Sequence, residues 1–262
     1  MTAEHTDDRA NKTAYADRST DSKLWDRHAD WWQREFTDGV DPEYTEQILP
    51  LVAGALAGAG RVLDIGTGEG QVARHLQQGA CSMVGIDPIR AQIEVATERG
   101  GGPRYVRAGA DSLPFAASSF DGAVACLVFE HIDEVDEAIH EVSRVLRPGG
   151  TFLFVLNHPL LQTPRSGWID DQIIDPPEQY WRIGPYLTEA STIEEVQRGV
   201  FIRFVHRPLS RYLNALSTAG LSLVHMNEPA PPPGFLAKDE HYRDAATIPR
   251  LLALQLRKDD RR

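Results

Sequence analysis

The stretch "RVLDIGTGEGQVARHL", Arg61 to Leu76, decides the fold of this 262-residue chain. It begins with an apolar run typical of a buried strand, passes through a glycine-rich turn, and ends in a pattern typical of a helix. Glycines at a strand-to-helix turn let the backbone approach a ligand closely. The stretch therefore predicts a strand–turn–helix unit that holds a nucleotide-like ligand.

The spacing of the glycines separates two kinds of nucleotide site. Gly66, Gly68 and Gly70 follow the order G-x-G-x-G, whereas dinucleotide sites use G-x-G-x-x-G, and Gln71 stands in place of the third glycine of that motif. Glu69 lies where the helix begins, and unless it points to solvent its carboxylate repels a pyrophosphate. The loop therefore favours a cofactor that needs no pyrophosphate pocket.

An acidic residue ends the next predicted strand. Asp87 follows the first glycine at about the distance where an acid binds a ribose in related nucleotide sites. A carboxylate can accept hydrogen bonds from two ribose hydroxyls at once. Together with the loop, this residue predicts a ribose-bearing cofactor.

Apolar strands and amphipathic helices alternate through the middle of the chain. We expect strands at 61–66, 82–87, 104–109, 120–129 and 151–157, with helices at 69–79, 88–100 and 133–150 between them. This order predicts right-handed crossovers and a parallel sheet with helices on both faces. Near the end, a strand at 221–229 is followed by a loop without a helix and by a strand at 248–256, which permits an antiparallel return.

The chain divides into a tail and one domain. Residues 1–20 are polar and are expected to form a flexible tail, and 21–262 form a single domain. Its expected parts are a helical lid at 22–57, a core at 58–157, a cap at 158–206 and a completion of the sheet at 207–257. The lid helix either docks on the core or closes Trp31 or Trp32 over a ligand.

Composition excludes several classes of function. The formal net charge is −11 and no long basic run offsets it, so we expect no nucleic-acid partner. The N-terminus lacks the apolar core of a secretory signal, and no 18-residue apolar run is present, so we expect a cytoplasmic protein without a membrane span. Cys81 and Cys126 are expected to be free thiols, and Asp170 and Asp171 lack a third ligand, so we expect no metal.

Four segments now resemble a known family. "VLDIGTGEG", "VGIDP", "AGADSLPFAASSFDGAVACLVFEHI" and "EVSRVLRPGG" resemble, in order and spacing, the motifs of class I S-adenosylmethionine-dependent methyltransferases, of the small-molecule, methyltransferase type 11-like group. The similarity runs from Arg61 to Asn157. It implies a Rossmann-like α/β fold with a seven-stranded, mostly parallel sheet whose last strand is antiparallel. It also implies S-adenosylmethionine as the cofactor.

The resemblance assigns roles to individual residues. For the methionine portion of the cofactor it implies Asp64, Gly66, Thr67 and Gly68, and near the methionine carboxylate and the methyl group Cys126 and Leu127. For the ribose and the adenine it implies Asp87, Pro88, Ile89, Asp111 and the Ser112 amide. The chemistry agrees, because Asp64 offers the negative partner that an ammonium needs and Asp111 can accept from an exocyclic amine. For these two acids and for Asp87, a purely structural role, such as capping a turn, stays open.

Three histidines are candidates for a general base. His131 follows the fourth strand and His158 the fifth, both at the edge where open α/β sheets bind ligands, and His206 ends a strand of the cap. For His131 a structural hydrogen bond is the alternative. The cap also carries aromatic side chains that either line an acceptor pocket or pack the cap itself, namely Trp168, Tyr180, Trp181 and Tyr186.

The sequence thus predicts methyl transfer to a small-molecule acceptor by in-line displacement, with O, N and C attack all open. One alternative is a methyltransferase-like binding protein without turnover. Another is an NAD(P)-dependent oxidoreductase, which the glycine spacing and Asp64 disfavour. The identity of the acceptor and the oligomeric state stay open.

Overall fold

The computed structural model describes residues 18–78, 81–238 and 244–260. Its first element is helix α1, Arg18–Phe36, so the last residues of the predicted tail are helical. The rest of that tail, residues 1–17, lies outside the described residues, as does Gly79, the predicted end of the helix at 69–79.

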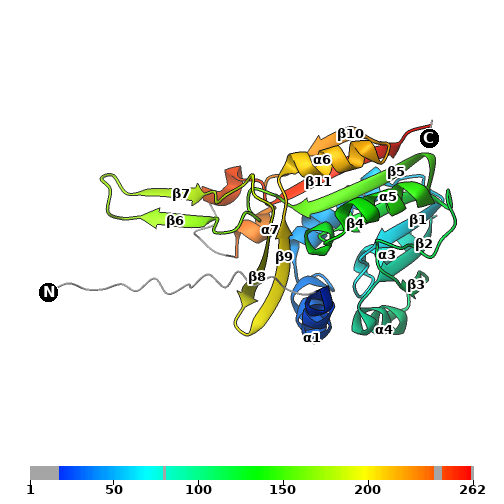
Figure 1. Ribbon diagram of the computed structural model, residues 1–262. Coiled ribbons are helices and arrows are strands. Elements are labelled where there is room, and N and C mark those ends of the chain that lie inside the picture. Colours follow the sequence, from blue (N-terminus) through cyan, green and yellow to red (C-terminus); the bar gives the residue numbers. More distant parts are fainter. Residues whose placement is uncertain (1–17, 79–80, 239–243, 261–262) are drawn as a thin grey trace.

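A seven-stranded sheet forms the centre of the molecule (Figure 1). Its strand order is β10-β11-β5-β4-β1-β2-β3. The strands are β1 (Arg61–Ile65), β2 (Ser82–Asp87), β3 (Arg104–Arg107), β4 (Phe120–Cys126), β5 (Leu146–Asn157), β10 (Leu221–Asn227) and β11 (Leu251–Lys258). Strands β1 to β5 pair in parallel, and β11 runs antiparallel to both β5 and β10. The predicted Rossmann-like sheet with one antiparallel strand is confirmed.

Helices cover both faces of this sheet. They are α2 (Leu49–Ala55), α3 (Gln71–Gln77), α4 (Arg90–Arg99), α5 (Val135–Val145), α6 (Leu209–Thr218) and α7 (Pro233–Leu236), with shorter turns at Phe129–His131 and Asp244–Thr247. A π-helix, Glu43–Ile48, leads into α2, so the second part of the predicted helical lid at 22–57 contains a π-helix as well as an α-helix. None of the described helices is both long and apolar enough to cross a membrane.

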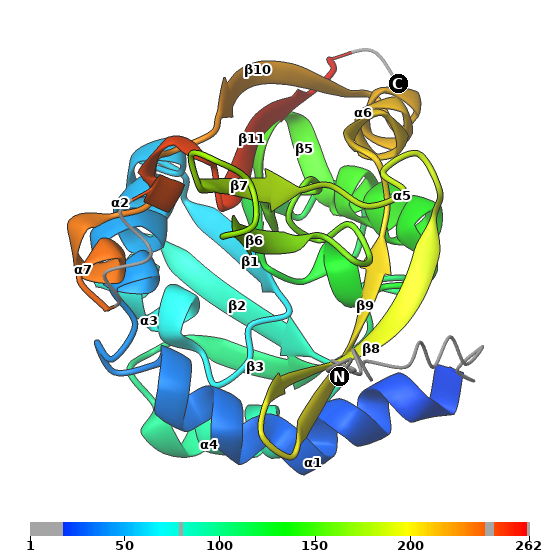
Figure 2. The same cartoon turned by 90° about the vertical axis from the view of Figure 1, so that its left-hand side faces the viewer.

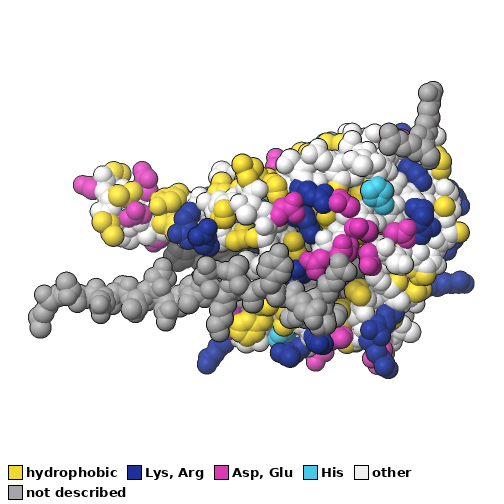
Figure 3. All heavy atoms as spheres, viewed as in Figure 1, with side chains coloured by type: hydrophobic (Ala, Val, Ile, Leu, Met, Phe, Trp, Pro, Cys, Tyr) yellow, Lys and Arg dark blue, Asp and Glu magenta, His cyan; other side chains and the backbone are white. Residues whose placement is uncertain are grey.

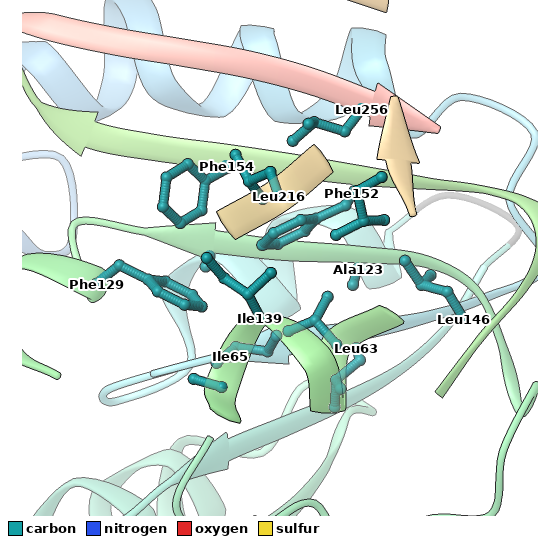
Figure 4. Close-up of a cluster of buried hydrophobic side chains, with 14 of the residues drawn as sticks. Leu63, Ile65, Ala123, Phe129, Ile139, Leu146, Phe152, Phe154, Leu216 and Leu256 are labelled. Atoms are coloured by element: carbon teal, nitrogen blue, oxygen red, sulfur yellow. The ribbon is translucent and has the colours of Figure 1, made fainter. Parts of the chain in front are cut away.

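Two apolar clusters lie on opposite faces of the sheet. One joins the sheet to α5 and α6, and Figure 4 shows Phe152 and Phe154 of β5 against Ile139 and Leu216. The other joins it to the π-helix, α2 and α3. Full burial of one such side chain contributes about 1.5–3 kcal/mol, so these clusters fix the strand ends that carry the site. Both cysteines are free thiols; Cys126 is buried, whereas Cys81 is only partly buried.

The predicted cap consists of two hairpins. Strands β6 (Gly167–Asp171) and β7 (Glu178–Arg182) form one, and β8 (Ala190–Gln197) and β9 (Val200–His206) form the other. The β6–β7 hairpin stands out from the body of the molecule, whereas β9 lies beside α1 (Figures 1 and 2). The two halves of the cap therefore have different surroundings.

Candidate functional site

A cavity of about 340 Å³ opens at the carboxyl ends of β1, β2 and β4. Parallel strands of an open α/β sheet bind ligands at this edge. The cavity is lined by most of the residues predicted for the cofactor, namely Asp64, Gly66, Thr67, Gly68, Asp87, Pro88, Ile89, Asp111, Cys126 and Leu127. Ser112 is not among the lining residues.

The glycine loop has a backbone that other residues rarely adopt. Gly66, Gly68 and Gly70 have φ angles of +65°, +55° and +90°. A Cβ at Gly66 would overlap the side chain of Val128, and one at Gly70 would overlap the hydroxyl of Tyr105. These two glycines therefore allow the loop to pack against its neighbours. A Cβ at Gly68 would instead point into the cavity, where its nearest neighbour would be Nε1 of Trp32 at 3.8 Å.

Asp64 is a buried carboxyl at the end of β1. Its Oδ2 accepts a hydrogen bond from Thr67 Oγ1 at 2.6 Å. Burial raises its pKa to about 7, and the hydrogen bond from Thr67 offsets part of that rise. A cation that entered the cavity beside Asp64 would favour the ionised form.

Asp87 ties the glycine loop to the end of β2. Its Oδ2 accepts from the Gly68 amide at 3.0 Å and its Oδ1 from the Ile89 amide at 2.8 Å. Burial raises its pKa to about 6, and these two hydrogen bonds act against the rise. Each carboxylate oxygen has two lone pairs, so both oxygens can still accept from a diol such as a ribose.

The surroundings of Glu69 contradict the expectation that its carboxylate repels a pyrophosphate. The side chain does not point to solvent; it is 1% exposed and forms ion pairs with Arg74 and, at 2.7 Å, with Arg99. Two guanidinium groups therefore compensate the charge that was expected to repel a pyrophosphate. The helix start at α3 is held by this cluster, and the case against a dinucleotide does not rest on Glu69.

His131 lines the cavity as a neutral base. Its Nδ1 lies 2.8 Å from the carbonyl oxygen of Arg203, and because a carbonyl only accepts, Nδ1 carries the proton and Nε2 keeps a lone pair. Burial and, to a smaller extent, the nearby charge of Arg203 lower its pKa to about 4, although the hydrogen bond to the Arg203 carbonyl acts against this shift. The structural hydrogen bond that was the alternative role does exist, and it orients the ring.

The other two histidines do not line the cavity. His158 is buried; its Nε2 lies 2.7 Å from Glu228 Oε1, and its Nδ1 accepts from the Leu160 amide at 3.2 Å. His206 is buried with Nε2 2.8 Å from the carbonyl oxygen of Tyr186. The expectation that His158 or His206 acts as the base is therefore unsupported by the geometry.

The aromatic wall of the cavity comes from α1 and the π-helix. Trp25, Trp32 and Tyr44 line it, and their rings meet nearly at right angles, with centroids 5.7 Å apart for Trp25 and Trp32 and 6.2 Å for Trp32 and Tyr44. Trp25 also lies edge-on to His131. The sequence did not propose Trp25 for the site, although it shares a helical face with Trp32.

The remaining predicted aromatic residues lie elsewhere. Trp31 donates from Nε1 to Gln197 of β8, and Trp168, Tyr180 and Trp181 belong to the β6–β7 hairpin. The Tyr186 hydroxyl accepts from the Leu209 amide at the start of α6. None of these five side chains lines the cavity. The roof of the cavity is therefore α1, which contacts β9 and α4 (Figure 2). The β6–β7 hairpin, the first half of the cap, does not form this roof.

The lining residues also define the charge of the cavity. Among the described residues, the lining contains six acidic side chains and no lysine or arginine: Asp64, Glu69, Asp87, Asp111, Asp133 and Glu134. Asp133 is paired with Arg203 at 2.5 Å, and Glu69 with two arginines. In the part of the chain that the structure describes, no group of three or more His, Cys, Asp and Glu side chains is placed to hold a metal ion.

Comparisons with known proteins indicate a methyltransferase. A family model described as a methyltransferase domain matches residues 63–154. The chain is similar to a malonyl-[acyl-carrier protein] O-methyltransferase of Enterobacter lignolyticus, with 26% identity over 170 residues that cover 64% of this chain and 66% of that protein. It is also similar to the ubiquinone/menaquinone biosynthesis C-methyltransferase UbiE of Syntrophotalea carbinolica, with 33% identity covering 50% of this chain and 58% of that protein. The chain thus spans less than two thirds of either relative.

A solved structure matches more of the chain. An S-adenosylmethionine-dependent methyltransferase from Mesorhizobium loti has a TM-score of 0.69 and 27% identity, covering 80% of this chain and 96% of that one. The match therefore covers a larger share of this chain than either of the two relatives does.

Proposed function

The chain belongs to the class I S-adenosylmethionine-dependent methyltransferase family, and from that premise we propose that it transfers a methyl group to a small-molecule acceptor. One observation carries the proposal. A single cavity brings Asp64, Asp87 and a neutral His131 together at the carboxyl edge of the sheet. The acceptors of the two relatives differ from each other, so neither acceptor is assigned to this chain.

The cavity fits S-adenosylmethionine, the cofactor of this family. Asp64 is a buried carboxyl that accepts a hydrogen bond from the neutral Thr67 hydroxyl, and the amino group of the cofactor would favour its ionised form. Asp87 can accept from the ribose hydroxyls while it keeps its two backbone hydrogen bonds. Gly68 has no side chain, so its backbone is open to close approach by a ligand beside the Trp32 ring.

The bound cofactor supplies a methyl group that is already activated on a sulfonium. The protein therefore contributes mainly position and exclusion of water. Trp25, Trp32 and Tyr44 form an aromatic wall that holds an apolar or flat acceptor in line. His131 Nε2 takes the proton from an acceptor hydroxyl or amine as the new bond forms, and the Arg203 carbonyl keeps the ring in the tautomer that this step needs.

The charge of the cavity lining limits the chemical class of the acceptor. An anionic acceptor would bring a second negative charge, beside the carboxylate of the cofactor, into a cavity whose described lining residues include no lysine or arginine. The cavity therefore suits a neutral or cationic small molecule with an ionisable O–H or N–H group. This choice favours O or N attack over C attack.

Two measurements test the function. Calorimetry should show micromolar or tighter binding of S-adenosylmethionine and of S-adenosylhomocysteine, with far weaker binding of NAD. Release of S-adenosylhomocysteine should then be followed with matched panels of neutral phenols, amines and carboxylic acids. Binding without product release from any panel member would leave a binding protein without turnover. Preference for carboxylic acids would contradict the assignment of the acceptor class.

The proposed base has its own test. His131→Asn keeps a polar side chain of similar size and should lower single-turnover methylation by about 10²–10⁴-fold, with cofactor affinity changed by less than about threefold. His158→Asn is the matched control, because that ring lies outside the cavity. Equal rates for the wild type and His131→Asn would show that His131 is not the base. The proposal that the protein transfers a methyl group would not be affected.

A further inference from the structure

The β6–β7 hairpin is a small sheet with two open edges. Strands β6 and β7 pair with each other, from Gly167–Arg182 to Asp171–Glu178, and have no other ladder partner in the described part of the chain. The hairpin projects from the body (Figure 1). A two-stranded hairpin is at best marginally stable alone in water, and an open edge is a template for another strand.

This hairpin also exposes large apolar side chains. Ile173, in the turn, is 96% exposed, and Leu187, just beyond the base, is 83% exposed. Ile174, Tyr180 and Ile183 are exposed as well. Apolar side chains gathered on one projecting element mark a surface that binds a partner.

Charges are divided along the length of the hairpin. Acidic side chains occupy the outer half and the turn, namely Asp170, Asp171, Asp175 and Glu178. Arg165 and Arg182 lie at the base. Figure 3 shows the acidic groups near the free end and basic groups where the hairpin joins the body. Two such hairpins side by side in opposite directions would place unlike charges together.

We propose that β7 pairs antiparallel with β7 of a second copy of this chain. The sequence of the strand, "EQYWR" over Glu178–Arg182, is complementary to itself in this arrangement. With Tyr180 opposite the partner's Tyr180 on the two-fold axis, Glu178 lies opposite the partner's Arg182, and Arg182 opposite the partner's Glu178. Side chains at alternate positions share a face, so the two ion pairs flank the tyrosine pair on one face of a four-stranded sheet.

The same register accounts for the exposed apolar residues. Continued beyond Glu178, it brings the turn with Ile173 and Ile174 toward the partner's Ile183 and the partner's Leu187. Each contact occurs twice, as a two-fold interface requires. The outer strand is then β6, whose Asp170 and Asp171 discourage addition of further strands. A second copy would therefore pair with the open edge of β7, form ion pairs with its charged side chains and cover its exposed apolar side chains.

Sedimentation of the full chain tests the proposal. The monomer has a mass of 29.1 kDa, and we expect twice this mass at micromolar concentration. Arg182→Glu and Glu178→Arg should each raise the dissociation constant of the dimer by roughly tenfold or more, because two attractive pairs become repulsive. Arg198→Glu, an exposed position in the β8–β9 turn, is the matched control and should leave the dimer unchanged.

Mixing the two variants is the sharper test. Arg182→Glu presents two acids and Glu178→Arg presents two arginines, so an equimolar mixture should form a heterodimer as stable as the wild type. Cofactor binding reports that each variant is folded. A wild-type monomer at 100 μM, dimers that survive both substitutions, or a mixture that stays monomeric would each overturn the proposal. A monomer that pellets with phosphatidylcholine vesicles would identify a lipid surface as the occupant instead.

Discussion

At the scale of single residues, the two buried carboxyls of the cavity have different partners and different expected effects. Asp87 receives two backbone amides, which position it for a diol. Asp87→Ala should remove the charge-assisted hydrogen bonds to the ribose, about 1.5–3 kcal/mol, and lower the affinity for S-adenosylmethionine by roughly 10- to 150-fold. Calorimetry measures this, with Asp170→Ala on the distant hairpin as the control. An unchanged affinity would show that Asp87 does not contact the ribose.

Asp64 should release a proton when the cofactor binds. Its pKa is raised to about 7 in the free protein, so at pH 6.5 most of the carboxyl is protonated, and a bound ammonium lowers that pKa. Calorimetry in buffers of different ionisation enthalpy should therefore report release of about half a proton or more at pH 6.5 and little at pH 8.5. Asp64→Asn should abolish the release. The same release in wild type and Asp64→Asn would assign the proton to another group.

The raised pKa of Asp64 also affects stability. A carboxyl whose pKa is higher in the folded state holds its proton more tightly there than in the unfolded chain. Between the ordinary pKa near 4 and about 7, this group therefore makes the free protein less stable as the pH rises. Bound cofactor relieves this effect because it supplies the missing positive partner.

Sequence reasoning at this scale succeeded where a motif fixes the backbone. Glycines at fixed spacing and an acid at the end of a strand predict which side chains reach one edge of a parallel sheet, and these residues do line one cavity. It could not rank His131 above His158, because both follow strands at that edge. The difference arises from contacts distant in sequence: Glu228 engages His158, and the Arg203 carbonyl orients His131.

At the scale of elements, α1 is the part of the roof with the clearest attachments. Gln33 bonds Gln92 of α4 at 3.0 Å, and His28 accepts from the Phe201 amide of β9 at 3.4 Å. These contacts hold α1 across the cavity. The buried members of both apolar clusters come from other elements, and α1 adds only the partly buried Trp32 and Phe36 at the side of one cluster. Deletion of residues 1–36 should therefore impair turnover more than folding.

Thermal unfolding and single-turnover methylation of the same preparation test this prediction. Deletion of residues 1–17 alone, which ends before α1, is the matched control and should keep both properties. If removal of 1–36 abolished cooperative unfolding, α1 would be part of the structural core rather than a roof.

Prediction of the elements depended on burial. Strands β1, β2, β4 and β5 are apolar because both faces of the sheet are covered, so their sequence is distinctive. Strands β6 and β7 were missed because their residues are exposed or only partly buried, and their sequence lacks an alternating pattern. Three of the aromatic residues that suggested a pocket wall, Trp168, Tyr180 and Trp181, belong to a projecting hairpin.

At the scale of the whole molecule, β11 holds the sheet together. Leu254 lies between Phe154 of β5 and Met226 of β10 and is fully buried. Leu254→Ala should cost about 2–5 kcal/mol of unfolding free energy, measured by urea denaturation. Val224→Ala in β10, where the side chain is 60% exposed, is the control and should change stability by less than about 0.5 kcal/mol. Similar losses for both would contradict the central position of β11.

The order of strands also has a consequence for biosynthesis. Strand β5 lies next to β11, which follows it by about a hundred residues of chain and is the last strand that the structure describes. Until the ribosome has released β11, the edge of β5 that pairs with β11 has no partner. The apolar side chains around Phe154 are then accessible to association with other chains. Pairings this distant in sequence form slowly. A nascent chain of this topology should therefore bind holding chaperones until its final strand emerges.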